Sequence, residues 1–171
     1  MYLVVVMPQE FRSYINDVIP KVAEAYGNLL SIKLIVGDVK LSNRFYDPFR
    51  NQYRAWQIID SLGPCKEPTV YVLNVDAYVP SLNFVFGLAD PYLKCAAVFT
   101  PRLNHPNHIT FTTRLAKEIV HESGHLMGLH HCLDFRCVMS FSNSIIDVDR
   151  KSWRFCNRCY NLLQRSLISK L

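Results

Sequence analysis

Histidine and cysteine side chains that can bind a metal ion gather between His121 and Cys159. His121 and His125 are four residues apart, and on a helix this spacing projects both imidazoles from one face, about 6 Å apart along the axis. Gly128 follows, where a residue that tolerates positive φ can turn the chain back, and His131 then supplies a third imidazole. Three neutral imidazoles leave the fourth position of a tetrahedral Zn²⁺ open for water, which is typical of a catalytic site.

Glu122 directly follows the first of these histidines, and its carboxylate is a candidate general base. Zinc lowers the pKa of a bound water toward about 7, and a carboxylate beside the ion can take the proton that the water releases. The chemistry expected from this pair is hydrolysis of a polarised carbonyl, with the peptide bond as the first candidate. The pattern therefore predicts a zinc-dependent peptidase that uses a zinc-bound water activated by Glu122.

Four cysteines beside these histidines form a second ligand set. Cys132 and Cys137 enclose four residues and Cys156 and Cys159 enclose two, and both spacings are typical of a structural Cys₄ zinc site. Because His131 and Cys132 are adjacent, their Cα atoms are about 3.8 Å apart, so a filled Cys₄ site should fix where His131 points. We therefore expect two Zn²⁺ ions per chain, one catalytic and one structural.

Disulfide bonds are the alternative for these cysteines, and the start of the chain argues against them. Its apolar run lacks a basic start and is too short for a signal peptide or a membrane span, and no other segment approaches about 18 unbroken apolar residues. We expect a cytoplasmic protein with no membrane partner, whose thiols stay reduced and free to bind metal. Cys65 and Cys95 lie apart from the cluster and are expected to be buried small hydrophobic residues.

The stretch from His121 to Cys159 resembles the archaemetzincins, a branch of the metzincin zinc metallopeptidases. That family is marked by HExxHxxGxxH followed at once by Cys, then by a second Cys, a Met two residues later and a closing CxxC. Every one of these positions is matched here. Segments 83–90 and 96–103 also resemble the family, whereas the first 80 residues match only in outline.

The resemblance implies a role for each matched residue. The catalytic zinc would be held by His121, His125 and His131, and the structural zinc by Cys132, Cys137, Cys156 and Cys159. Glu122 would be the general base, Gly128 the turning glycine, and Met139 the methionine turn beneath the metal. Some metzincin branches place Tyr two residues after this Met, but here Phe141 has no donor, so charge stabilisation is expected mainly from zinc. The resemblance alone also suggests aminopeptidase-like action on short peptides.

The length and composition fit one globular domain. The 171 residues are 50% hydrophobic and 19% charged, and no linker, repeat or low-complexity tract divides them. We expect a single metzincin-like peptidase domain over residues 1–171, with a sheet-and-helix part to about residue 130 and a zinc-clamped part over about 131–171. The fold class is α+β: a twisted mixed sheet of about five strands, helices packed on it, and a C-terminal helix carrying the Cys₄ site.

Hydrophobic periodicity places the elements of this fold. The predicted strands are 3–7, 32–41 and 69–75, the predicted helices are 11–26 and 48–62, and 84–89 and 95–100 are expected to pair antiparallel. Because the early strands alternate with helices, the sheet should begin as parallel β-α-β units. The motif helix is expected to begin near Thr112 or Thr113 and to end at about Leu129, and a last helix is expected from about Asp149.

The segment 84–89 carries the predicted substrate contacts. In metzincins the corresponding strand lies at the edge of the sheet above the zinc and pairs with extended substrate. An edge strand exposes unpaired N–H and C=O groups that can capture a peptide, although a covered strand is the other interpretation. The candidate substrate-binding residues are Phe86, Gly87, Leu88 and Ala89, and the expected partner is a peptide or protein substrate.

Two other functions compete with a peptidase. A zinc-binding metzincin-like protein with an occluded or idle active site would carry the same ligands without turnover. A zinc-stabilised nucleic-acid-binding module would suit the net charge of +5, but the basic residues are spread along the chain, with one loose group at Arg150, Lys151, Arg154 and Arg158. A nucleic-acid binder needs a contiguous basic face, so nucleic acid is not the favoured partner.

Three further histidines are not expected to bind metal. His130 adjoins His131 but is out of register for the motif, so we expect it at the rim of the site. His105 and His108 lie in a segment rich in Pro and Asn, which predicts a surface loop.

Overall fold

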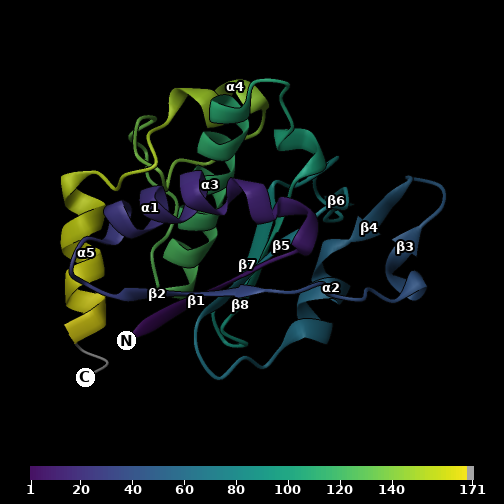
Figure 1. Cartoon of the computed structure of the whole chain (residues 1–171), viewed down its shortest axis with the longest axis horizontal. Helices are drawn as coiled ribbons and strands as arrows, with labels where there is room; N and C mark the ends of the chain where they lie inside the picture. The colour runs from purple at the N-terminus through teal and green to yellow at the C-terminus, as the bar shows by residue number, and fades with distance from the viewer. Residues whose placement is uncertain (169–171) are drawn as a thin grey trace.

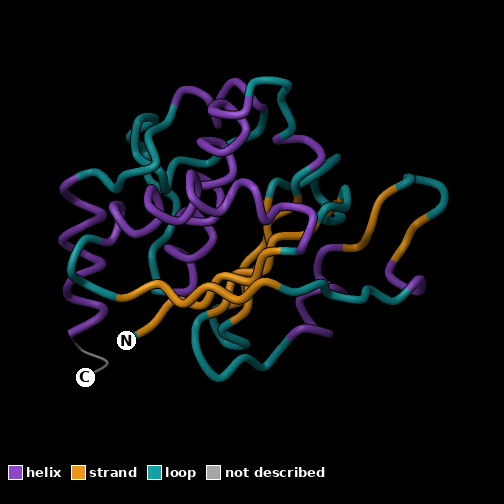
Figure 2. The backbone as a smooth tube through the Cα atoms, viewed as in Figure 1, coloured by secondary structure: helices purple, strands orange, loops and turns teal. Residues whose placement is uncertain are grey.

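A five-stranded mixed sheet runs through the middle of the molecule (Figure 1, Figure 2). The computed structural model describes residues 1–168, and its strands lie in the order β2-β1-β5-β8-β7. Their bounds are Tyr2–Met7 for β1, Ser31–Val36 for β2, Thr69–Leu73 for β5, Gly87–Asp90 for β7 and Cys95–Phe99 for β8. The first four in this order are parallel and β7 is antiparallel to β8, so the expected mixed sheet of about five strands is confirmed.

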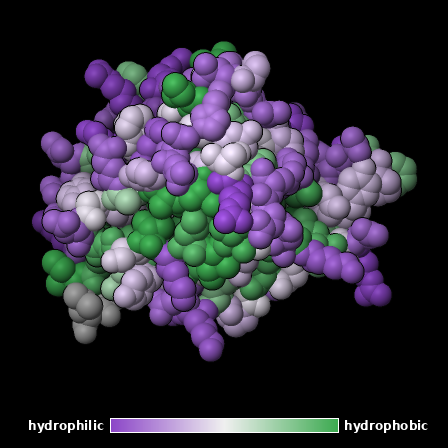
Figure 3. Space-filling view, in the orientation of Figure 1, coloured by the Kyte–Doolittle hydropathy of each residue, from purple (hydrophilic) through white to green (hydrophobic). Residues whose placement is uncertain are grey.

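Burial explains why the strands differ in sequence. β1 has a neighbour on each side and both faces covered, so residues 3–7 form a continuous buried apolar run. β2 is an edge strand in which exposed and half-buried residues alternate, and it ends at Val36, before the predicted limit at residue 41. Figure 3 shows apolar side chains over the middle of this face of the molecule, with polar side chains around them.

Helices cover both faces of the sheet. α1 (Ile15–Tyr26) and α3 (His108–Leu126) lie on one face and α2 (Ala55–Leu62) on the other (Figure 1). α4 (Ile145–Arg150) and α5 (Asn157–Ile168) follow α3, and 3₁₀ turns occupy Gln9–Tyr14, Asn43–Phe45 and Pro101–Leu103. The larger core lies between the sheet, α1 and α3 and reaches α5, and a smaller one lies beneath α2. None of the helices in residues 1–168 is long and apolar enough to cross a membrane.

The start of α3 differs from the prediction. The helix begins at His108 rather than near Thr112 or Thr113, because Asn107 is the residue that caps it. The Asn107 side chain accepts a hydrogen bond from the backbone N–H of Thr110 at 2.9 Å. Thr112, the expected cap, is instead fully buried within the helix.

The other helical predictions were right in place and inexact in extent. The segment 11–26 is a 3₁₀ turn followed by α1, and Pro20 lies inside α1 without ending it. The last helix, predicted from about Asp149, begins only at Asn157 as α5, and residues 145–150 form the separate helix α4, which starts at a reciprocal capping box of Ser144 and Asp147.

A small second sheet stands beside the main one. It consists of β3 (Tyr46–Asp47), β4 (Gln52–Arg54) and β6 (Ala77–Tyr78). β3 and β4 form a hairpin whose turn contains Asn51 at a φ of 55°, a conformation that Asn tolerates. The helix predicted at 48–62 therefore begins only at Ala55 and ends, as predicted, before Gly63.

Cys65 and Cys95 are bonded to each other, so the expectation that they are separate buried side chains is wrong. Cys65 lies in the loop after α2, and its backbone N–H donates to the carbonyl of Leu93 at 2.8 Å. This contact brings the loop against Cys95, the first residue of β8. The two cysteines are 30 positions apart in the chain, and no local pattern links them.

Candidate active site

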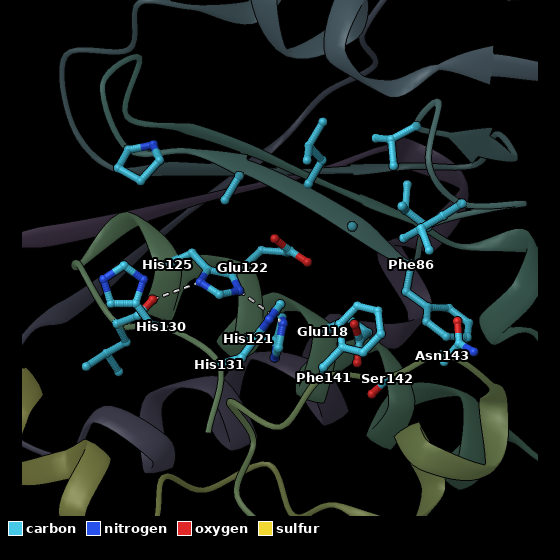
Figure 4. A pocket seen from close by; sticks show the side chains of 18 of the residues that line it. Phe86, Glu118, His121, Glu122, His125, His130, His131, Phe141, Ser142 and Asn143 are labelled. Carbon is cyan, nitrogen blue, oxygen red and sulfur yellow. Dashed lines mark hydrogen bonds between the residues drawn. The ribbon is translucent and has the colours of Figure 1, made fainter. Parts of the chain in front are cut away.

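α3 supplies the first two histidines and Glu122, and its end supplies the turn to the third. The helix is buried along most of its length because the sheet, α1 and the C-terminal segment surround it. It stops at Leu126, and Gly128 then adopts a φ of 92°, the left-handed conformation expected there. This turn returns the chain to α3 and places His131 beside the other two imidazoles (Figure 4).

The hydrogen bonds of the imidazoles prepare them to bind a metal. His121 Nδ1 lies 2.7 Å from the carbonyl of Val138, and His125 Nδ1 lies 2.8 Å from the carbonyl of Leu129. A carbonyl oxygen only accepts, so each Nδ1 carries the proton and each Nε2 presents a lone pair. The two Nε2 atoms are 3.2 Å apart, with no proton to share between them. A tetrahedral Zn²⁺ with bonds of about 2.0–2.1 Å brings two nitrogens to about 3.3–3.4 Å, so the donor set fits zinc.

Burial keeps these imidazoles neutral. It lowers the pKa of His125 to about 4 and the pKa of His121 well below its ordinary value, with the charge of Lys151 adding to the effect at His121. The pKa of His131 is lowered by the same two causes. Neutral imidazole is the form that binds metal, so the three side chains are ready as ligands at neutral pH.

Glu122 points into the cleft between the imidazoles and the strands above them (Figure 4). Its side chain is buried, and burial raises the pKa of its carboxyl well above the ordinary value, with the charge of Glu118 adding to the rise. A bound cation acts in the opposite direction, because a positive charge favours the carboxylate. Burial thus favours the neutral form of Glu122, and a cation bound at the imidazoles would favour the carboxylate.

Met139 lies directly beneath α3. It is fully buried, and a Cβ on Gly124 would be 2.4 Å from its sulfur. Gly124 therefore lets the methionine segment approach the helix closely, which explains a glycine in the last turn of α3. The same segment supplies the Val138 carbonyl that orients His121, and the Met139 carbonyl accepts from the N–H of Cys132 at 2.9 Å.

The four cysteines converge below the histidines. Their Sγ atoms all lie within 4.8 Å of one another, and none of them forms a disulfide. Burial raises the pKa of Cys137 to about 11 and also raises the pKa of Cys159. The pKa of Cys156 is lowered in spite of burial, by hydrogen bonds from Cys159, Cys137 and Cys132. Four convergent thiols that share protons fit a structural zinc site, in which the ion replaces those protons.

A cavity of about 570 Å³ lies between β7 and α3. One wall comes from residues 79–92, including the predicted substrate-binding residues Phe86, Gly87, Leu88 and Ala89. The other wall comes from α3 and from residues 128–143, and His121, Glu122, His125 and His131 all face the cavity. Within residues 1–168, β7 is the last strand of the sheet and has no strand beside its outer edge, and three of its residues, Gly87, Leu88 and Ala89, line the cavity.

Two charged residues of the site, Glu118 and Lys151, were missed by reasoning from sequence. Their charged groups are 2.9 Å apart and both side chains are almost fully buried. Lys151 Nζ also donates to the carbonyl of Ser140 at 3.4 Å, which ties the methionine segment to α3. Glu118 lines the cavity one turn before Glu122, and that helical spacing was the available signal.

The remaining histidines differ in how well they fit the prediction: His105 is half-buried before α3, and His108 is exposed but is the first residue of α3 and not part of a loop. His130 is exposed and lines the rim of the cavity. The ring of His108 is paired with Asp17 of α1 at 2.7 Å. The loose basic group does not form a shared face either, since Lys151 is buried against Glu118 and Arg154 pairs with Glu24.

Comparisons with known proteins agree with this geometry. The model of peptidase family M54 matches residues 2–165. An archaemetzincin from Pyrobaculum aerophilum is 53% identical over 131 residues, which cover 76% of this chain and 82% of that protein. An archaemetzincin from Pyrococcus horikoshii is 39% identical over 172 residues, which cover 93% of this chain and 90% of the relative.

Solved structures resemble the whole fold. The crystal structure of an archaemetzincin from Methanopyrus kandleri superimposes with a TM-score of 0.88 at 38% identity, covering 98% of this chain and 96% of that one. The structure of a zinc-dependent peptidase from Methanocorpusculum labreanum gives a TM-score of 0.81 at 27% identity, covering 94% and 99% of the two chains.

Proposed function

The chain belongs to peptidase family M54, the archaemetzincin zinc metallopeptidases, and we propose that Glu122 is the general base with which it hydrolyses peptide bonds. The observation that carries this proposal is the position of the Glu122 carboxylate, which points into the cavity beside three convergent imidazoles (Figure 4). A carboxylate in this place can take a proton from water and later return it to the leaving amine.

The proposal includes two metal ions per chain. His121, His125 and His131 would hold a catalytic zinc, and Cys132, Cys137, Cys156 and Cys159 would hold a structural zinc. The catalytic zinc, when bound, lowers the pKa of water and polarises the carbonyl of the substrate. Support comes from the unprotonated Nε2 atoms of His121 and His125 and from the four cysteine thiols, which form no disulfide.

The substrate proposed for the cavity is a short peptide in an extended conformation. The free edge of β7 can pair with it, since Phe86, Gly87, Leu88 and Ala89 line the cavity at that edge. Phe141, which also lines the cavity, offers no hydrogen-bond donor, so the chain itself adds little charge stabilisation there. Aminopeptidase-like cleavage is the form of this activity that we propose to test first.

We also propose that residues 1–171 act as one peptidase domain, with a sheet-and-helix part to about residue 130 and a zinc-clamped part after it. The larger core supports this, because it contains Tyr26 of α1, Met139 and Leu163 of α5 in one buried cluster. The two parts therefore share a hydrophobic core.

The experiment that tests the function compares the wild-type protein with Glu122→Ala. We expect both to contain two zinc ions per chain and only the wild-type protein to cleave a mixed peptide library, with a loss on the order of 10²–10⁴-fold or more in kcat. Glu122→Gln, which keeps the shape of the side chain, should lose the same activity. An idle site would show no Glu122-dependent cleavage in any of the three proteins, and that result would reject the proposal.

A further inference from the structure

β7 passes over Glu122 at Gly87, and the contact leaves no room for a side chain. A Cβ added to Gly87 would lie 2.4 Å from Glu122 Oε1 and 2.6 Å from both Cδ and Cγ of the same residue. These distances are shorter than two non-bonded heavy atoms can approach. The backbone of Gly87 does not have a positive φ, in contrast to Gly27 and Gly128, so the need for glycine here is steric.

The two backbones that meet at this contact are both held in place. Gly87 is paired with Val98 in the ladder between β7 and β8, and the carbonyl of Phe86 accepts from the N–H of Phe99 at 2.8 Å. Glu122 lies in the buried C-terminal part of α3, which packs against the sheet. A side chain at position 87 therefore cannot push the strand and the helix apart at low cost. The end of the Glu122 side chain is the part that would move.

We propose that Gly87 is a positioning residue for Glu122: its bare Cα provides the space in which the carboxylate sits between β7 and the imidazoles. A methyl group at position 87 turns the carboxylate out of this space while the fold stays intact. This inference rests on the proposed role of Glu122 as general base. It also separates two functions of β7, which offers its outer edge to the substrate and its inner face to the catalytic carboxylate.

A different reason for glycine would be access of the substrate to the strand. A side chain that only blocked the substrate would raise KM and leave kcat near its original value. A displaced general base has the opposite signature, because substrate binding survives and the chemical step slows. Misplacement of a reacting group by about 1 Å can cost on the order of 10²-fold in rate.

The test uses Gly87→Ala with Gly37→Ala as the matched control, since a Cβ on Gly37 meets nothing within 4 Å. For Gly87→Ala we expect full zinc content, a cooperative thermal unfolding transition, a KM within about twofold, and a kcat lower by on the order of 10²-fold. Gly37→Ala should match the wild-type protein in all four measurements. A Gly87→Ala protein that keeps its kcat, or that changes only in KM, overturns the proposal.

A second measurement is independent of catalysis. The unfolding free energy is determined for Gly87→Ala, Glu122→Ala and the double variant, which forms a double-mutant cycle. If the methyl group contacts Glu122, the Gly87→Ala change costs less in the Glu122→Ala background. Equal costs in both backgrounds would show that the contact is absent, and the inference would be rejected even if Glu122 is the base. If Glu122→Ala keeps its peptidase activity while the cycle shows an interaction between positions 87 and 122, Glu122 is not the general base. Gly87 then contacts Glu122 but does not position a catalytic group.

Discussion

The histidines of the cavity take their orientation from backbone carbonyls, whereas the cysteines below them mainly contact one another. Val138 and Leu129 hold two of the imidazole rings through their carbonyls, at 2.7 and 2.8 Å. The cysteine sulfurs instead accept from backbone N–H groups, as Cys137 does from the N–H of Cys156 at 3.3 Å, and the sulfurs of Cys132 and Cys156 are 3.8 Å apart. The histidine group is therefore anchored by carbonyls outside it and the cysteine group mainly by its own members, so we expect a bound ion to add more to the stability of the cysteine group.

The chain segments that the two groups join also differ. Two histidines come from one helix and the third from the turn that follows it, so the group is local. The cysteines join the loop after α3 to the segment that begins α5, and they enclose the methionine segment between them. We therefore expect the proposed structural ion to stabilise more of the tertiary structure than the proposed catalytic ion.

The largest effect that would sharpen this comparison is expected from Cys159→Ser. Cys159 is buried at the start of α5, and without its thiolate the proposed structural zinc is lost, so the unfolding free energy should fall by more than about 4 kcal/mol. His131→Ala should abolish cleavage but lower the unfolding free energy by only about 1 kcal/mol, because its ring is exposed. Denaturant unfolding gives the unfolding free energy of each variant, and metal analysis gives its zinc content. Equal losses of stability would break the comparison.

The next effect concerns the ion pair that anchors the methionine segment on the histidine side. Lys151→Met leaves Glu118 buried without its partner and should lower the unfolding free energy by about 3–5 kcal/mol. The double variant Glu118→Leu with Lys151→Met removes both charges, and we expect most of that loss to be recovered. Denaturant titrations of the three variants give the values. A double variant as unstable as Lys151→Met would mean that the pair is needed for more than charge balance.

A smaller effect is expected from Gly124→Ala, which tests the packing beneath the histidines. The new methyl group would meet the sulfur of Met139 at 2.4 Å, so we expect a loss of about 1–3 kcal/mol in unfolding free energy. Alanine is otherwise preferred over glycine inside a helix by about 1 kcal/mol, so a gain in stability would show that Met139 moves aside freely. In a Met139→Ala background, where the sulfur is absent, we expect Gly124→Ala to cause no loss of unfolding free energy.

The most gradual effect is a pH dependence of opposite sign for the two groups in the metal-free protein. The pKa of His125 is lowered to about 4, so the unfolded chain binds more protons and stability is lost as the pH falls from about 6.5 toward 4. The pKa of Cys137 is raised to about 11, so stability is lost as the pH rises from about 9 toward 11. Each group contributes at most about 1.4 kcal/mol per pH unit. Thermal unfolding of the protein with chelator, measured from about pH 4 to about pH 11, gives the stability in both ranges. A stability that does not change between about pH 6.5 and pH 4 would contradict a buried neutral His125.

The local patterns of the chain predicted the elements of the site well. The spacing of His121 and His125 identified a helix, and Gly128 marked the turn after it, because both follow from the geometry of a single helix and its end. The alternation of strands and helices before residue 75 predicted parallel pairing, which the structure confirms. The boundaries were less predictable, since the cap at Asn107 competes with other plausible caps nearby.

The sequence by itself determined which side chains could bind metal and accept a proton, because ligand type and helical spacing are properties of a short segment. Only the tertiary structure decided that Gly87 lies against Glu122, that Met139 fills the place beside Gly124, and that Cys65 is bonded to Cys95. The same holds for the pairing of Glu118 with Lys151. Each of these contacts joins segments that no periodic pattern connects, and their geometry is set by how the sheet, α3 and the C-terminal segment pack together.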